Sequence, residues 1–111
     1  MNSVRQFKAS LFQALAHPTR LEILEALRGG ELSVGAILAR VGRDQANVSQ
    51  HLGILRARGL VLNRKDGNQV FYAVRDPLLF TVLDEMRRFA TAHANELAAS
   101  LEELRADVNE P

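Results

Sequence analysis

Two short amphipathic segments separated by a tight turn constrain the fold of this chain more than any other feature. The first begins at Ser33, which suits a helix N-cap, and stops at Gly42. The second begins at Asp44, another good capping residue, and stops at Gly59. Two short helices joined by a tight turn that contains glycine make a helix-turn-helix.

A β-hairpin is predicted directly after these helices, in the stretch LVLNRKDGNQVFYAV. Its β-branched and aromatic residues flank Asp66-Gly67, a dipeptide that strongly favours a tight hairpin turn. Leu32 is placed to add a short third strand. A helix-turn-helix followed by a hairpin is a winged helix. The expected fold class is therefore mostly α with a small β-hairpin (α+β), as one winged helix-turn-helix domain over residues 1–111.

Two further helical segments flank this part of the chain. Apolar spacing predicts a first helix over about 4–16, and a second in AHPTRLEILEALRGG, where Pro18 suits the first turn and Gly29-Gly30 a left-handed stop. The last element is a long helix over about 77–104, with apolar residues at spacings of three and four. This stripe is longer than a small domain covers, so we expect part of it to contact a second copy.

The outer face of the second helix of the motif, about 44–58, carries no charged residue, whereas a solvated helix face normally carries Lys and Glu. In a winged helix this helix lies in the major groove of DNA. Small residues allow close approach there, amides and hydroxyls both donate and accept, and acidic residues would be repelled by phosphate. We interpret this face as a base-reading surface, formed by Gln45, Ala46, Asn47, Ser49 and Gln50.

Basic and amide residues border the base-reading surface. Arginines stand before and beside the helix, where phosphate backbones would pass: Arg43, Arg40, Arg56 and Arg58. The hairpin, or wing (about 60–74), carries residues suited to the minor groove or the backbone, namely Arg64, Lys65, Asn68 and Gln69. A single surface arginine usually has no specific role, but a set of them around an uncharged face favours double-stranded DNA as the partner.

The composition supports this interpretation. Residues 1–75 hold eleven Lys and Arg against five Asp and Glu, a balance of +6, whereas residues 76–111 hold three against eight, a balance of −5. A basic first part suggests a polyanionic partner. The chain has no cysteine, which excludes disulfides and thiolate metal sites. With no leader and no apolar run long enough for a membrane span, we expect a cytoplasmic protein without membrane contact.

Three stretches, FQALAHPTRLEILEALRGGELSVGAILARVG, NVSQHLGILRARGLV and GNQVFYAV, resemble the ArsR/SmtB family of bacterial winged-helix repressors. The resemblance covers nearly the whole chain, and HPTRLEIL with VSQHLGILRARGLV at this spacing is quite specific. It implies a homodimer whose first and last helices form the interface. It also implies an inverted-repeat operator and repression that a ligand could relieve. An unidentified small-molecule effector, a pH effect through His93 and the absence of any ligand are the alternatives left open for this chain.

The chain departs from the metal-sensing members of that family. One type of sensor uses cysteines, which are absent here. The other pairs Asp-x-His with a later His-x-x-Glu/His on the last helix. Here Asp76 is present, but Leu78 stands two positions later, where the motif has its histidine. The positions of the later His-x-x-Glu/His hold Phe89 and Ala92. We therefore expect no metal at that site, and no other cofactor.

The three histidines have modest interpretations. His93 and Glu96 have the shape of half a metal site, but the residues for the other half are missing, so we expect His93 to lie at the dimer seam. Whether His93 and Glu96 form a cross-axis metal or pH-sensitive site stays open. His17 is expected to help start the second helix, and His51 to have a structural role at the edge of the buried stripe.

The main hypothesis is thus a DNA-binding regulator of transcription, and its alternative is a winged-helix module for protein–protein assembly without an operator of its own. An acidic or leucine-rich outer face would have favoured the alternative. No nucleophile–base pair and no phosphate-binding glycine loop supports an enzyme.

Overall fold

The computed structural model describes residues 3–109. These residues fall into two compact units, and the division lies between Pro77 and Leu78. The first unit contains the helix-turn-helix and the hairpin, and the second is a single long helix.

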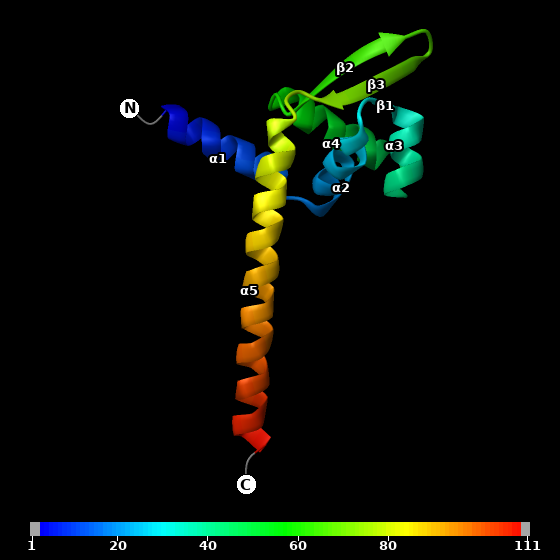
Figure 1. Cartoon of the computed structure of the whole chain (residues 1–111). Helices are drawn as coiled ribbons and strands as arrows, with labels where there is room; N and C mark the ends of the chain where they lie inside the picture. Colours follow the sequence, from blue (N-terminus) through cyan, green and yellow to red (C-terminus); the bar gives the residue numbers. More distant parts are fainter. Residues whose placement is uncertain (1–2, 110–111) are drawn as a thin grey trace. The chain divides into compact units, whose positions relative to one another are not determined.

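The first unit follows the predicted order of elements and adds a 3₁₀ turn (Figure 1). Its elements are α1 (Ser3–Leu15), α2 (Pro18–Ala26), the 3₁₀ turn η1 (Leu27–Gly29), β1 (Leu32–Ser33), α3 (Val34–Val41), α4 (Gln45–Ala57), β2 (Val61–Asp66) and β3 (Gln69–Val74).

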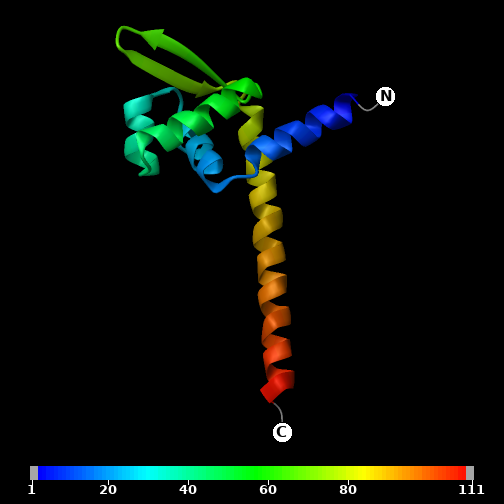
Figure 2. The same cartoon turned by 180° about the vertical axis from the view of Figure 1, so that it is seen from behind.

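The three strands form an antiparallel sheet in the order β1-β3-β2. Leu32 pairs with Tyr72, which confirms the short third strand. In both Figure 1 and Figure 2 the far end of the β2–β3 hairpin projects beyond the helices of this unit. The prediction of a mostly helical chain with a small hairpin is confirmed.

The hairpin turn lies one residue later than the sequence suggested. Asp66 pairs with Gln69 and still belongs to β2, so the two loop residues are Gly67 and Asn68. Gly67 has φ +61°, and no non-glycine residue among those described has a positive φ. A positive φ at only the first loop position is the pattern of a type II′ turn, which requires glycine at that position.

The end of α2 also differs from the prediction. The α-helix ends at Ala26 and continues as a 3₁₀ turn, in which the carbonyl of its first residue, Leu27, accepts the N–H of Gly30 at 3.0 Å. Gly30 has a positive φ of 124°, which favours glycine as predicted, but its ψ of −170° is extended and not that of the left-handed helical cap that was expected. Tightening of the final turn satisfies the terminal carbonyl instead.

The start of α2 and the ends of the helix-turn-helix pair form as the sequence predicts. Nδ1 of His17 accepts the N–H of Thr19 at 3.1 Å, and Pro18 occupies the first turn. Ser33 caps α3 through a 3.1 Å hydrogen bond from the N–H of Ala36. Gly42 ends α3 with φ 71° and ψ 25°, a left-handed conformation that glycine adopts without steric cost.

The core of the first unit lies between α2, α3, α4 and the start of β2. Helix α2 contacts both α3 and α4. The side chains that form this core are almost completely buried: Ile23, Leu24, Leu27, Ile37, Val48, Leu52, Leu55 and Val61. Burial of aliphatic side chains of this size is the main favourable term in folding, so this core fixes the orientation of α4.

One polar cluster lies at the edge of that core. His51 on α4 is only 6% exposed, and its Nδ1 accepts a hydrogen bond from Nε of Arg20 at 3.1 Å. Its ring centroid lies 4.2 Å from that of His17. Arg20 also donates to the carbonyls of Gln13 and Ala14 near the end of α1. The predicted structural role of His51 is confirmed, because this cluster connects α1, α2 and α4.

The second unit is α5 (Leu78–Asn109), which extends five residues past its predicted end at 104. Along it lies a row of exposed large apolar side chains: Leu78, Val82, Met86, Phe89, Leu97, Leu101, Leu104 and Val108. None of the helices in residues 3–109 has the length and apolar character needed to cross a membrane.

The stability of the fold should depend on pH through His51. Burial, followed by the positive charges of His17, Arg20 and Arg43, holds the pKa of His51 below its ordinary value. The unfolded chain therefore binds this proton more readily than the native protein. The free energy of unfolding should be fully retained above about pH 6.5 and should fall as the pH drops below it.

Urea unfolding at about pH 7.5 and about pH 5.5, at one protein concentration, measures this dependence. His51→Gln keeps an acceptor for Arg20 but cannot titrate, so its stability should change less between the two pH values. Lys65→Gln, at an exposed position on the hairpin, is the control and should show the same pH dependence as wild type. An equal loss of stability in His51→Gln and wild type would contradict this assignment.

Candidate nucleic-acid interface

Helix α4 has one buried and one exposed face. Val48, Leu52 and Leu55 are buried, whereas Ala46 and Gln50 are exposed. The remaining residues of the predicted base-reading surface, Gln45 and Ser49, are also exposed, and Asn47 is half-buried. The structure thus presents to solvent a helix face that contains no charge, supported from behind by an apolar core.

Asn47 differs from its neighbours on this face. Its backbone N–H donates to Oδ1 of Asp44 at 2.8 Å, which caps the start of α4. Its own side-chain oxygen is buried and has no hydrogen-bond partner within the described chain. Because this oxygen is buried, Asn47 is less accessible to a partner than the exposed Gln45, Ser49 and Gln50.

A cavity of about 440 Å³ connects the base-reading surface with the wing. Gln45 and Ser49 of α4 line it together with Asn68 and Gln69 of the hairpin. The sequence had assigned these four residues to the interface from two separate segments, and the fold brings them to one cavity. None of the residues lining it is charged; the complete lining is Ser33, Val34, Gly35, Leu38, Gln45, Ser49, Asn68, Gln69, Val70 and Tyr72.

The sequence interpretation missed Ser33, Gly35 and Tyr72 as parts of this region. Tyr72 lies here because it pairs with Leu32, which places the start of α3 beside β3. The short strand at Leu32 was predicted, but its partner residue was not. A register for that strand would have been the signal that identifies Tyr72.

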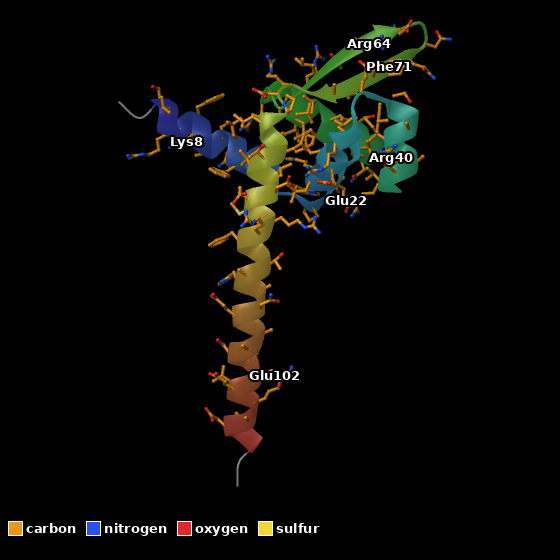
Figure 3. The ribbon with its side chains drawn as sticks, viewed as in Figure 1. Lys8, Glu22, Arg40, Arg64, Phe71 and Glu102 are labelled. Atoms are coloured by element: carbon orange, nitrogen blue, oxygen red, sulfur yellow. The ribbon has the colours of Figure 1, made fainter. Side chains whose placement is uncertain are left out.

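Arg64 on the wing makes close contacts within the protein. Its Nε and Nη2 donate to the two carboxylate oxygens of Glu31 at 2.7 Å and 2.6 Å. Its Nη1 lies 3.7 Å from the carboxylate of Asp66. Figure 3 labels Arg64 and Phe71 on the hairpin. The guanidinium of Arg64 lies over the ring of Phe71, 4.6 Å from its centroid. The hydrogen bond from Arg64 holds the pKa of Glu31 below its ordinary value, so this carboxylate stays charged.

Two arginines of the helix-turn-helix also have protein partners. Nη2 of Arg43, just before α4, lies 3.1 Å from a carboxylate oxygen of Glu22 on α2. Nη1 of Arg40 donates to the carbonyl of Ala26 at 3.2 Å, which ties α3 to the end of α2.

At the other end of α4, Nη1 of Arg58 donates to the carbonyl of Ser10 on α1 at 3.2 Å and also to its hydroxyl. Arg56 and Lys65 are exposed, and neither forms an ion pair within residues 3–109. The basic residues around the base-reading surface therefore fall into two groups: arginines that contact other parts of the protein, and Arg56 and Lys65, which form no ion pair within residues 3–109.

Helix α5 carries His93 and Glu96, the two residues that the sequence suggested as half of a metal site. Within residues 3–109, no group of three or more His, Asp or Glu side chains is arranged to hold a metal ion. His93 stacks on Phe89 of the same helix, with ring centroids 6.2 Å apart. The role of His93 at a dimer seam stays a prediction.

Known proteins resemble this chain in sequence. A family model described as a helix-turn-helix domain matches residues 15–64. An uncharacterized HTH-type transcriptional regulator of Mycobacterium tuberculosis (strain ATCC 25618 / H37Rv), Rv0081, is 40% identical over 102 residues, which are 91% of this chain and 90% of the relative.

Solved structures resemble this one over most of its length. The crystal structure of M. tuberculosis Rv0081 has a TM-score of 0.77 and 36% identity, and covers 86% of this chain and 96% of its own. A homodimeric winged helix-turn-helix DNA-binding domain from Mycobacterium bovis, titled a possible ArsR-family transcriptional regulator, has a TM-score of 0.75 and 28% identity, and covers 85% and 87%. The transcriptional repressor BigR from Xylella fastidiosa has a TM-score of 0.72 and 31% identity, and covers 80% and 91%.

The Asp44 cap of α4 should contribute measurably to the free energy of unfolding of the protein. Asp44→Ala removes the hydrogen bond to the N–H of Asn47 and should lower the free energy of unfolding by about 1 kcal/mol. Asp44→Asn retains an acceptor and should lose much less. Urea unfolding of the three proteins measures the difference, and an equal loss in both variants would mean that charge at the helix start, rather than the cap, matters.

Proposed function

This chain belongs to the ArsR/SmtB family of winged helix-turn-helix transcriptional regulators, and we propose that it represses transcription as a homodimer bound to an inverted-repeat operator. Its relatives are transcriptional regulators, and it is itself a DNA-binding regulator of this kind. The operator, the repression and the residues that contact DNA are the proposed part.

The observation that carries the proposal is the exposed, uncharged face of α4 beside the wing. In a winged helix this face enters the major groove, where amide side chains can bond base edges in two directions. Gln45 and Ser49 share a cavity with Asn68 and Gln69, so the helix and the hairpin offer one continuous hydrogen-bonding surface. We assign base contacts to Gln45, Ala46, Ser49 and Gln50, with Asn47 in a lesser role.

Backbone contacts are assigned to the margins of this surface. Arg56 and Lys65 are exposed and project without an ion-pair partner in the described chain, so they are available to phosphates. Arg43 and Arg64 stand at the same margins but are paired with carboxylates. Such contacts position a protein on the duplex and carry no sequence information by themselves.

The homodimer is supported by the apolar row on α5. Phe89 is 68% exposed and Leu104 is 58% exposed, in a helix where none of the described side chains is buried. An exposed apolar stripe of this length marks an interaction surface. We propose that a second copy covers it, as a two-fold pair, and the relative from M. bovis is described as homodimeric.

The competing function, a protein–protein module without an operator, finds no support among the relatives, which are named as transcriptional regulators. We likewise propose no catalytic role. A small-molecule effector remains part of the proposal without an assigned site.

DNA binding should be dimeric and should weaken steeply with salt. Two α4 helices related by a two-fold axis should contact half-sites about one helical turn apart, ~34–36 Å. Phosphate contacts by Lys and Arg release counterions, so several such contacts should weaken binding by orders of magnitude between about 50 and about 200 mM salt. Gel shift and footprinting on the DNA upstream of its own gene measure both properties. Affinity that stays flat across the salt titration would contradict the proposal.

Gln50 should carry sequence preference. Replacing it by Ala should cost about 1–3 kcal/mol of binding free energy on the cognate site and little on random DNA, because a base contact is lost. Lys65→Ala is the matched comparison and should weaken binding to both DNAs, because it contacts only the backbone. Equal weakening on both DNAs by Gln50→Ala would show that the base-reading surface is misassigned.

A further inference from the structure

We propose that Glu22 and Glu31 act as internal counter-ions of the DNA-binding surface, which hold Arg43 and Arg64 in ion pairs that compete with phosphate. The two carboxylates would thereby set the affinity for DNA and its salt dependence. This inference rests on the proposed DNA-binding function and concerns the regulation of the same surface.

The contacts at the wing leave Arg64 little capacity for another anion. Glu31 takes two parallel hydrogen bonds from its guanidinium, the geometry in which arginine also binds phosphate. The carboxylate of Asp66 lies 3.7 Å from the third nitrogen, Nη1, and the ring of Phe71 covers one face of the guanidinium plane. A bidentate phosphate contact through the Nε and Nη2 edge of Arg64 therefore requires the pair with Glu31 to open.

The second pair, at the start of α4, also joins an arginine to a glutamate. Arg43 lies in the turn between α3 and α4, and its Nη2 is 3.1 Å from a carboxylate oxygen of Glu22 on α2. Both side chains are nearly half exposed, at 46% and 43%. Glu22 therefore neutralises Arg43 at the start of α4, and Glu31 neutralises Arg64 on the wing.

Exposure makes these pairs exchangeable. Ion pairs between exposed side chains are generally weak, because water solvates both partners and salt screens them, and the bidentate pair of Arg64 is the stronger of these two. Phosphate can therefore replace the carboxylate at modest cost. The displaced carboxylate then remains close to the negatively charged backbone, which opposes binding. Removal of the carboxylate charge should release the arginine and remove this repulsion together.

The test uses near-isosteric neutral substitutions. Glu31→Gln and Glu22→Gln should each raise affinity about two- to fivefold, the range expected for loss of an exposed ion pair. The slope of log affinity against log salt should steepen by about one for each released arginine. Because phosphate contacts carry no sequence information, the affinities for the upstream DNA and for random DNA of equal length should rise by the same factor.

A double-mutant cycle separates release of an arginine from a general change in charge. If Glu31 acts through Arg64, then Glu31→Gln should have a much smaller effect on affinity in an Arg64→Gln background. The same holds for Glu22 in an Arg43→Gln background. Glu102→Gln is the matched control, because it also removes one charge from an exposed ion pair, with Arg105 at 3.6 Å on α5. It should leave affinity and salt slope close to wild type.

The outcomes separate this inference from the proposed function. If wild type fails to bind its upstream DNA at low salt, the proposed function fails. If wild type binds but Glu31→Gln and Glu22→Gln match Glu102→Gln, the counter-ion inference alone is wrong. Reduced affinity in Glu31→Gln, with thermal unfolding unchanged, would overturn it in another way, because the pair would then support the bound position of the wing.

Discussion

The packing of α4 against α2 is the interaction on which the rest of this structure depends. A helix of this length gains little stability alone and must bury one face. Leu52 and Leu55 provide that face, and His51 at its edge is tied to Arg20 of α2 by a hydrogen bond. With one side of α4 fixed against the core, its opposite side is held at the surface beside the wing, which is the position that the proposed base contacts require.

Electrostatics around this surface are more balanced than the basic composition of the first unit suggests. Arg43 and Arg64 each have a carboxylate partner, so the free protein avoids a cluster of unpaired cations around α4. Like charges held close together repel and weaken a fold, and internal counter-ions relieve that repulsion. Arg56 and Lys65 keep their charge available, so the surface can still attract a polyanion from a distance.

The long helix α5 has a different physical problem. None of its described side chains is buried, although a row of large apolar residues from Leu78 to Val108 follows its length. Exposure of such a row to water is unfavourable, and its burial against another surface is the natural remedy. In the proposed dimer, a second copy of the chain supplies that surface. The two α4 helices of such a dimer would match the two-fold symmetry of an inverted repeat.

The sequence by itself determined which elements form and which face of α4 stays uncharged, because caps, apolar spacing and glycine stops act over a few residues. Its errors were also local: the turn is formed by Gly67-Asn68, and α2 ends as a 3₁₀ turn. The tertiary structure alone decided which charges meet. Glu31 and Arg64 are 33 positions apart, and no local pattern reports that pairing. The register that places Tyr72 beside the start of α3 likewise arises only when the strands assemble.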